Sequence, residues 1–405
     1  MRRAALHNLG CKANAYETEK IGEQLAERGF EIVPFAGEAE VYVINTCSVT
    51  AIADKKSRQM IRRARRRNPQ AIVAAVGCFV EGTELDLAEL GCDIALGNRD
   101  KSRIVDRIEA LLAQRDTADR EEEPSCDSAA PGWLSGRTRG LVKIQDGCDR
   151  FCSYCIIPYL RGRSRSRPVE EIVSEVRRLC DMGVQEIVLT GIHNSSYQDG
   201  NEDLLGLCRA IDGRTEVRRL RLGSLEPHNI TRESAKGFAE LASLCPHFHL
   251  SLQSGSDAVL ARMNRRYTTE EFAEGVALLR EAFDEPGITT DVIAGFPGET
   301  EEEFEEGMAF MRRMRFSDMH VFPYSRRLGT RADAMEGQIT ERVKEECSEK
   351  LIALAGEMAA DFGRRWEGRE VEVLFETKEE IGGRTLWSGF TREYLRAFME
   401  SGEDL

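Results

Sequence analysis

Residues 141–155 have the sequence LVKIQDGCDRFCSYC. The apolar run 141–144 predicts a strand, and three cysteines follow it in a CxxxCxxC loop, namely Cys148, Cys152 and Cys155. Three thiolates this close along the chain can bind three irons of a [4Fe–4S] cube and leave the fourth iron open. The alternatives are buried structural cysteines or a zinc site, but structural zinc needs four ligands and no fourth cysteine or histidine lies nearby in sequence. We therefore expect these three cysteines to hold an iron–sulfur cluster.

The sequence on the C-terminal side of this loop alternates between strand and helix patterns. We expect helices that include residues 169–182, 270–283 and 301–314. We expect strands at residues 141–144, 186–190, 219–222, 247–250, 289–293 and 318–322. Because a closed barrel of this kind has eight units, six β/α units predict a partial (β/α)6 barrel.

The N-terminal part of the chain alternates in the same way. We expect strands at 4–8, 31–33, 41–45, 71–76 and 93–96, with helices at 17–28, 52–67 and 101–113. Such alternation is typical of a parallel sheet with helices on its faces. The whole chain is thus expected to be of the α/β class.

Changes in composition suggest five segments. The predicted boundaries are an N-terminal domain at 1–115, a linker at 116–138, the barrel at 139–339, a connecting helix at 340–366 and a short β-module at 367–405. The linker is poor in aliphatic residues and contains the charged run REEEPS at 120–125. The last segment shows strand alternation at 371–376 and a second strand-like run at 385–390.

Charge and cysteine content narrow the function classes. The 405 residues include 12 cysteines and carry a formal net charge of −14, which argues against general nucleic-acid binding but says nothing of local patches. No apolar run is long enough to span a membrane, and the N-terminus lacks the core of a signal peptide, so we expect a cytoplasmic protein without a membrane partner. Disulfides are rare in that compartment, so the cysteines call for another explanation.

Three further cysteines follow predicted strands of the N-terminal domain. They are Cys11, Cys47 and Cys78. Loops that follow parallel strands share the carboxyl edge of the sheet, where ligands bind, so cysteines spread over nearly 70 residues are expected to converge there. Buried packing is the alternative, since cysteine is often simply buried. We read the other six cysteines as structural or incidental: Cys92, Cys126, Cys180, Cys208, Cys245 and Cys347.

The CxxxCxxC loop after the first strand of a partial barrel resembles the radical S-adenosylmethionine (SAM) superfamily. In that superfamily SAM chelates the open iron and is cleaved to a 5′-deoxyadenosyl radical, so no acid–base side chain is expected as the catalytic residue. The resemblance implies SAM contacts in the loops that follow the predicted strands, where glycines let the backbone approach a ligand. The expected contact residues are Tyr154, Gly191, His193, Glu226, Gln253, Ser254, Asp291 and Gly295.

A flavodoxin-like domain with dispersed cysteines, a radical SAM barrel and a small C-terminal β-domain together resemble the methylthiotransferases. Their C-terminal module is the RNA-binding TRAM domain, which is longer in that family than residues 367–405 allow. The resemblance implies two [4Fe–4S] clusters, SAM, the anticodon loop of tRNA as partner, and an electron donor such as flavodoxin or ferredoxin. The second cluster would bind sulfur at its own open iron, and the methylthio group would be transferred to a carbon of the substrate.

Three substrates remain open within this family. The segments LGCKANAYE at 9–17 and LTGIHNSSY at 189–197 are most similar to the group that acts on C2 of N6-threonylcarbamoyladenosine at position 37 of tRNA. The alternatives are N6-isopentenyladenosine-37 and a ribosomal-protein aspartate, and His193-Asn194 departs from the runs usual in both of those groups.

Basic residues cluster locally despite the acidic total. They occur in a predicted helix at 55–67, after the CxxxCxxC loop at Arg161, Arg163, Arg165 and Arg167, and near residues 326–331. Local positive charge is what a phosphate-contacting surface needs. For the helix, a solvated face is an equally good explanation, whereas the two loop clusters are expected to contact RNA.

Overall fold

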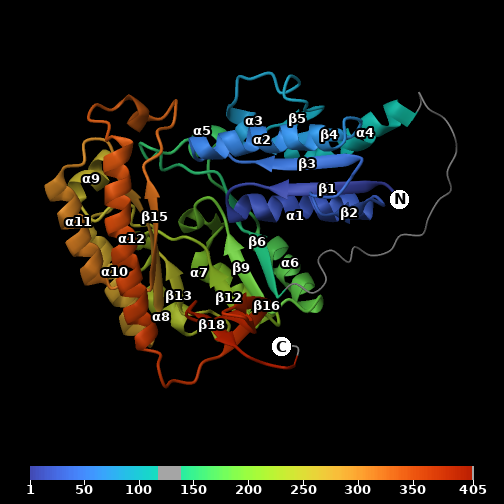
Figure 1. Cartoon of the computed structure of the whole chain (residues 1–405). Coiled ribbons are helices and arrows are strands. Elements are labelled where there is room, and N and C mark those ends of the chain that lie inside the picture. The colour runs from blue at the N-terminus through green and yellow to red at the C-terminus, as the bar shows by residue number, and fades with distance from the viewer. Residues whose placement is uncertain (117–137, 404–405) are drawn as a thin grey trace. The chain divides into compact units, whose positions relative to one another are not determined.

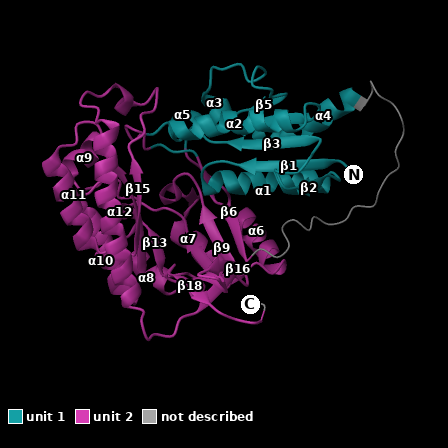
Figure 2. Ribbon diagram, viewed as in Figure 1, with its two compact units in different colours: residues 1–135, 147–149, 155–163 teal, residues 136–146, 150–154, 164–405 magenta. Residues whose placement is uncertain are grey.

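The computed structural model describes residues 1–116 and 138–403. The predicted linker at 116–138 lies almost wholly outside the described residues. Two compact units are distinguished in Figure 2. The first unit contains residues 1–135, 147–149 and 155–163, and the second contains the remainder, so parts of the CxxxCxxC loop belong to different units.

The first unit is built on a five-stranded parallel sheet in the order β2-β1-β3-β4-β5. Its strands are β1 (Arg3–Asn8), β2 (Glu31–Val33), β3 (Val41–Thr46), β4 (Ile72–Gly77) and β5 (Ile94–Leu96). All five lie where the apolar runs predicted them. The central strands β3 and β4 are buried along their full length, as expected for parallel strands covered on both faces.

Helices cover both faces of this sheet. The helices are α1 (Lys12–Glu27), α2 (Ala51–Arg67), α3 (Cys78–Gly82), η1 (Lys101–Arg103), α4 (Ile104–Asp116) and α5 (Ile157–Arg161). Apolar side chains of α1 and α4 pack on one face, and those of α2 and α3 pack on the other. Figure 1 shows β1 and β3 between α1 and α2.

Helix α1 begins at Lys12, five residues before the predicted start. The prediction was late because Asn14 is a poor helix former. In the structure the Asn14 side chain donates hydrogen bonds to the carbonyl oxygens of Leu9 and Thr46, at 2.7 and 3.0 Å. These bonds hold a polar residue inside the first turn, and they place Cys11 at the N-cap of the helix.

The second unit contains the six strands that were expected to form a partial barrel. They are β6 (Arg139–Lys143), β9 (Glu186–Thr190), β12 (Arg219–Leu222), β13 (His247–His249), β14 (Gly287–Ala294) and β15 (Asp318–Pro323). They pair as two parallel sheets of three, β12-β9-β6 and β13-β14-β15, instead of one continuous sheet. Isolated parallel bridges, Leu220–Leu244 and Leu225–Leu250, lie where the two sheets adjoin.

Helices and short strands lie between these six strands and after the last of them. The helices are α6 (Val169–Asp181), η3 (Asn194–Ser196), α7 (Leu204–Arg214), η4 (Pro227–Asn229), α8 (Arg232–Ala239), α9 (Asp257–Arg262), α10 (Thr269–Ala282), α11 (Glu301–Met314), η5 (Arg331–Ala334) and α12 (Glu341–Arg364). The two-residue strands are β7 (Gln145–Asp146), β8 (Arg165–Ser166), β10 (Gln198–Asp199) and β11 (Glu202–Asp203). The predicted long helix from residue 340 is α12, with Thr340 as its N-cap.

The C-terminal segment forms a three-stranded antiparallel sheet in the order β16-β17-β18. Its strands are β16 (Val373–Ile381), β17 (Arg384–Thr391) and β18 (Arg396–Met399). The first strand begins two residues later than predicted, and the third was not expected from the sequence. Among the described residues, no helix combines the length and apolar character required to cross a membrane.

Candidate functional site

The first unit places three cysteines after neighbouring strands of its sheet. Cys11 caps α1 directly after β1, Cys47 follows β3, and Cys78 is the first residue of α3 after β4. These three strands lie side by side in the order β1-β3-β4. The cysteines therefore share the carboxyl edge, as the strand pattern predicted, and all three are free thiols.

The backbone at Gly10 packs closely against Cys47. Gly10 leaves no room for a side chain, because a Cβ atom there would lie 2.6 Å from the Cys47 sulfur. Burial, together with the neighbouring Cys78 and Cys11, raises the pKa of Cys47 to about 11 against hydrogen bonds from the backbone. Cys11 and Cys78 are thus close enough to interact electrostatically with Cys47. Three thiols in this arrangement fit an iron–sulfur cluster, which would bind them as thiolates once their protons are released.

Cys11, Cys47 and Cys78 do not form a group whose ligand atoms all lie within 4.8 Å of one another. Within the described part of the chain, the one group of three histidine, cysteine or carboxylate residues whose ligand atoms all lie within 4.8 Å is His249, Asp291 and His320. A cube binds each thiolate on a different iron, so its ligands need not converge on one point.

The CxxxCxxC cysteines are also free thiols. Cys148 and Cys155 belong to the first unit, where the Cys148 backbone N–H donates to the Gly162 carbonyl oxygen at 3.0 Å. Cys152 belongs to the second unit, and the Arg265 guanidinium donates to its sulfur at 3.3 Å. Arg265 thus places a charged hydrogen-bond donor against one sulfur of the CxxxCxxC set.

Glu226 is the centre of a charged group after β12 in the second unit. Its carboxylate pairs with Arg150 Nη2 at 2.5 Å, with Arg265 Nη2 at 3.1 Å and with His193 Nε2 at 3.3 Å. Burial alone would raise the pKa of Glu226. The hydrogen bond from His193 and the charges of Arg265 and Arg150 outweigh burial and lower this pKa to about 2. Glu226 is therefore ionised at any ordinary pH.

The sequence identified Glu226 and His193 but missed both arginines. Arg150 lies inside the CxxxCxxC loop, which was the one signal that could have found it. Arg265 follows α9 and reaches Glu226 only through the tertiary fold. A carboxylate beside a guanidinium, next to Cys152, can bind the ammonium and carboxylate groups of an amino acid.

Gly191 and Gln145 shape the loop after β9. Gln145 Oε1 accepts hydrogen bonds from the backbone N–H groups of Ile192 and His193, at 3.1 and 2.8 Å. A Cβ atom on Gly191 would lie 2.4 Å from the Asn194 side chain. Glycine is therefore required here for packing, independently of any ligand.

The remaining predicted contact residues lie around β14. The Gln253 backbone has a φ of +68°, which is rare outside glycine, and its N–H donates to the Asp291 carbonyl oxygen at 2.8 Å. Ser254 is buried beside it. Gly295 has a φ of +69°, and the ring of Tyr154 meets that of Phe296 edge-on at 6.4 Å. A positive φ at a residue other than glycine, as at Gln253, commonly marks a ligand-binding site.

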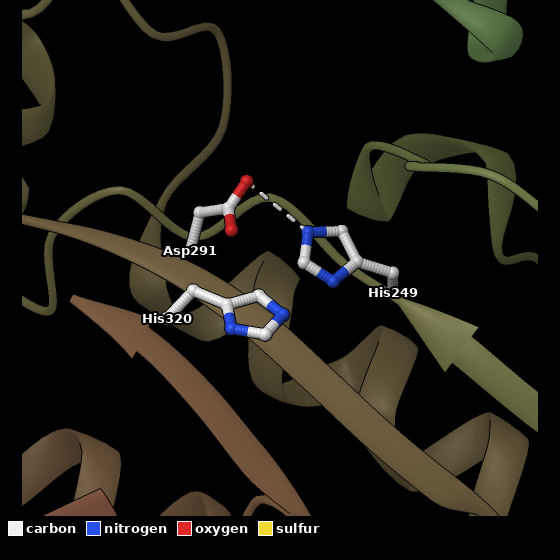
Figure 3. A group of neighbouring side chains, drawn as sticks. All are labelled: His249, Asp291 and His320. Atoms are coloured by element: carbon white, nitrogen blue, oxygen red, sulfur yellow. Dashed lines mark ion pairs between the residues drawn. The ribbon is translucent and has the colours of Figure 1, made fainter. Parts of the chain in front are cut away.

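Asp291 belongs to the three-residue group drawn in Figure 3. His249 of β13 points toward Asp291 of β14, with His249 Nε2 3.2 Å from Asp291 Oδ2, and its ring stacks on that of His320 of β15 at 5.8 Å between ring centres. The other ring nitrogen of His249 lies 2.9 Å from Thr289 Oγ1, which in turn lies 3.1 Å from His247 Nε2. The imidazole of His249 therefore fixes the direction of the Asp291 carboxylate. His247 is buried.

The expected RNA-facing arginines do not all face solvent. The prediction that Arg161 contacts phosphate is wrong, because its side chain is fully buried in an ion pair with Glu17. Arg65 of α2 is held by Asp93 and by three backbone carbonyl oxygens. Arg163 remains well exposed, although it pairs with Asp149.

Five of the six remaining cysteines lie within the described residues. Cys92, Cys208 and Cys245 are buried, and Cys180 and Cys347 are half-buried. Burial raises the pKa of each of these thiols, as expected for structural cysteines. Cys126 lies outside the described residues.

Comparison with known protein families defines the class. The Radical SAM superfamily matches residues 142–311, and the Uncharacterized protein family UPF0004 matches residues 3–97. Among solved structures, the radical SAM methyltransferase TsrM from Kitasatospora setae superimposes with a TM-score of 0.58 at 16% identity, covering 80% of this chain and 75% of that one. The cobalamin-dependent radical enzyme OxsB gives 0.55 at 12% identity, covering 89% and 56%. The second unit thus has the fold of a radical SAM enzyme.

Relatives in sequence narrow this class further. The threonylcarbamoyladenosine tRNA methylthiotransferase MtaB of Bacillus subtilis is 39% identical over 100% of this chain and 92% of its own length. The MtaB protein of Aquifex aeolicus is 38% identical, covering 92% of each chain. A tRNA-2-methylthio-N(6)-dimethylallyladenosine synthase of Syntrophus aciditrophicus is 34% identical, covering 94% of this chain and 86% of its own. The chain belongs to the radical SAM tRNA methylthiotransferases, enzymes that transfer a methylthio group to tRNA with the help of SAM and a [4Fe–4S] cluster.

Proposed function

We propose that this enzyme methylthiolates C2 of N6-threonylcarbamoyladenosine at position 37 in the anticodon loop of tRNA. The observation that carries the choice is the ranking of the relatives. Three proteins named for threonylcarbamoyladenosine are 36–39% identical, whereas two named for dimethylallyladenosine are 34% and 35% identical. The segments at residues 9–17 and 189–197 favour the same group.

The proposal assigns the CxxxCxxC cysteines to the cluster that cleaves SAM. A cluster held by these cysteines would supply the electron for reductive cleavage of SAM and so the radical chemistry of the reaction. The protein provides the three thiolates, Cys148, Cys152 and Cys155, and excludes water. No side chain is assigned as an acid or base, which is consistent with cofactor-borne chemistry.

Glu226 and Arg265 are proposed to bind the methionyl end of SAM. They pair with each other at 3.1 Å, and each would exchange that partner for an oppositely charged group of SAM. Asp291 is directed by His249 toward a ribose, together with Gln253 and Ser254. Tyr154, Gly191, His193 and Gly295 complete the proposed set around the adenosine and amino groups.

A second [4Fe–4S] cluster is proposed at Cys11, Cys47 and Cys78. Its support is the position of the three free thiols after adjacent strands and the electrostatic influence of Cys11 and Cys78 on Cys47. An open iron there would hold the sulfur that becomes the methylthio group. The first test is the iron content after anaerobic reconstitution.

We expect about eight irons per chain, two cubes of the type that cysteines ligate. Replacing Cys11, Cys47 and Cys78 together by alanine should reduce the content to about four. Replacing Cys92, Cys208 and Cys245 together serves as the matched control and should leave it at eight. About four irons in the unaltered chain would contradict the second cluster.

The substrate is tested by mass spectrometry of tRNA nucleosides from a strain that lacks this chain. We expect loss of the 2-methylthio derivative of N6-threonylcarbamoyladenosine alone, and its return when the chain is supplied. Loss of the isopentenyl derivative, or of a ribosomal-protein modification, would refute the choice. The proposal also includes a flavodoxin- or ferredoxin-type electron donor and a cytoplasmic location, where tRNA is found.

A further inference from the structure

A buried charged triad lies close to the three N-terminal cysteines in the first unit. Glu17 of α1 accepts hydrogen bonds from Lys101 Nζ and from Arg161 Nη1, the latter at 3.0 Å. The side chains of Glu17, Lys101 and Arg161 are 7%, 10% and 0% exposed. One carboxylate thus accompanies two cations, so the triad carries one net positive charge. Removing such charges from water costs free energy, which their attraction for one another only partly offsets.

Asn98 connects this triad to Cys78. Its amide nitrogen lies 3.6 Å from the Cys78 sulfur and donates to the Leu160 carbonyl oxygen at 3.0 Å. Its amide oxygen accepts from Lys101 Nζ at 2.9 Å. The amide nitrogen is the end nearer to the sulfur, since the amide oxygen lies 3.9 Å from it, where it accepts from the Cys78 thiol. Asn98 therefore presents a hydrogen-bond donor to one cysteine of the set.

Asn14 connects the same triad to the other two cysteines. Its side-chain oxygen accepts from Arg161 Nη2, and its nitrogen donates to the carbonyl oxygens of Leu9 and Thr46. Thr46 directly precedes Cys47, and Leu9 lies two residues before Cys11. A single network thus reaches the neighbourhood of all three thiols.

We propose that Asn98, oriented by Lys101, is a positioning residue that donates a hydrogen bond to the Cys78 sulfur and stabilises the reduced form of the cluster held there. The inference rests on the proposed second cluster. Hydrogen bonds to cluster sulfurs and nearby charge are the main means by which a protein sets the reduction potential of an iron–sulfur centre. Lys101 of the triad holds the amide oxygen of Asn98, and the amide nitrogen donates toward the sulfur.

This role distinguishes Asn98 from an ordinary packing residue. Reduction adds negative charge to the cluster, and a donor to sulfur stabilises the more negative form. Replacing Asn98 by aspartate removes the donor and adds a negative charge at nearly constant volume. Both changes disfavour reduction, so the potential should become more negative.

The experiment uses the full-length chain with Cys148, Cys152 and Cys155 replaced by alanine, so that only the second cluster can assemble. After anaerobic reconstitution, the midpoint potential is measured by redox titration followed by electron paramagnetic resonance. Asn98→Asp should shift the potential to a more negative value, and Asn98→Ala should shift it in the same direction by a smaller amount. Asn68→Ala is the matched control, because Asn68 also donates to a backbone carbonyl in this unit but lies at the end of α2 away from the cysteines. It should leave the potential unchanged.

The outcomes separate the two proposals. If no cluster assembles in the parent chain with Cys11, Cys47 and Cys78 intact, the second cluster itself is disproved. If the cluster assembles and both Asn98 variants keep the parent potential, the role of Asn98 is disproved. A folded Asn98 variant that loses its iron while Asn68→Ala retains about four irons supports the assignment, with folding monitored by circular dichroism.

Discussion

Glu299 is a half-buried carboxyl group held by two backbone N–H groups in the loop between β14 and α11. Its Oε2 accepts from Gly295 at 2.9 Å and from Phe296 at 3.3 Å. Burial nevertheless raises the pKa of Glu299 from its ordinary value of 4.5 to about 7, against these two bonds. The cost of desolvation therefore exceeds the gain from hydrogen bonding at this residue.

This shift predicts a pH dependence of stability. Between about pH 4.5 and pH 7 the carboxyl is ionised in the unfolded chain and protonated in the folded one, so the unfolded state binds fewer protons. Stability should therefore fall as pH rises through this window, by about 3 kcal/mol in all. Glu299→Gln should remove this fall, because glutamine accepts the same bonds without a charge.

Thermal unfolding at pH 5, 6 and 7.5 measures the effect. The control is Glu306→Gln on the solvent face of α11, which should leave the pH profile unaltered. A Glu299→Gln profile that still falls as steeply as the wild type would contradict the prediction.

At the scale of the element, threonine caps start several helices of the second unit. Thr231, Thr268 and Thr300 each accept a hydrogen bond from the third residue of the helix that follows, in α8, α10 and α11. In α11 the two residues also bond in the opposite direction, because the Thr300 backbone N–H donates to Glu303 Oε2 at 3.0 Å. Glu303 also pairs with Arg262 of α9. The cap therefore fixes both the start of α11 and its contact with a neighbouring helix.

Thr300→Ala should cost about 1 kcal/mol of stability, because one backbone N–H at the start of α11 loses its acceptor. For a unit of this size the unfolding midpoint should fall by about 2–4 °C. Thr300→Ser keeps the hydroxyl and should stay close to the wild type. Equal losses for the two variants in thermal unfolding would show that the methyl group, not the cap, matters.

At the scale of the whole chain, the C-terminal sheet packs on a buried ion cluster of the second unit. Arg221 of β12 donates to Glu186 of β9 at 2.9–3.0 Å and to the carbonyl oxygen of Arg392 at 3.1 Å. The guanidinium of Arg221 also lies 4.7 Å from the ring centre of Tyr394. Segments about 170 residues apart in sequence are joined here, and the turn between β17 and β18 covers charged residues of the strands.

Arg221→Met should destabilise the second unit by about 3 kcal/mol, because Glu186 would remain buried with one fewer partner. The loss stays at the low end for a broken buried pair, since Arg139 Nε remains 2.9 Å from Glu186. Urea unfolding measures the change. Arg209→Met breaks an exposed pair with Glu240 and should change stability by less than about 1 kcal/mol. A similar small change for both variants would disprove the role of the cluster.

Most elements were predictable because their signal is local. The strands at Glu31–Val33, Glu186–Thr190 and Arg219–Leu222 and the helix at Glu301–Met314 match the predicted bounds, since apolar alternation and caps lie within the element itself. The third strand, Arg396–Met399, was missed because only its pairing with β17 makes it a strand. The start of α1 was misplaced because Asn14 finds its partners in other loops.

Some residues of the candidate site could likewise be predicted from the sequence, and others could not. The spacing of Cys148, Cys152 and Cys155, and the position of Cys11, Cys47 and Cys78 after strands, could be read from the sequence because both patterns are local. Tertiary structure alone decided that Arg265 reaches Glu226, that Asn98 faces Cys78, and that Arg161 is buried on Glu17 instead of facing RNA. Arg161 and Glu17 are separated by 144 residues. A charged side chain in sequence carries no sign of its partner, and only the folded chain brings the two close enough for their attraction to exceed the cost of removing them from water.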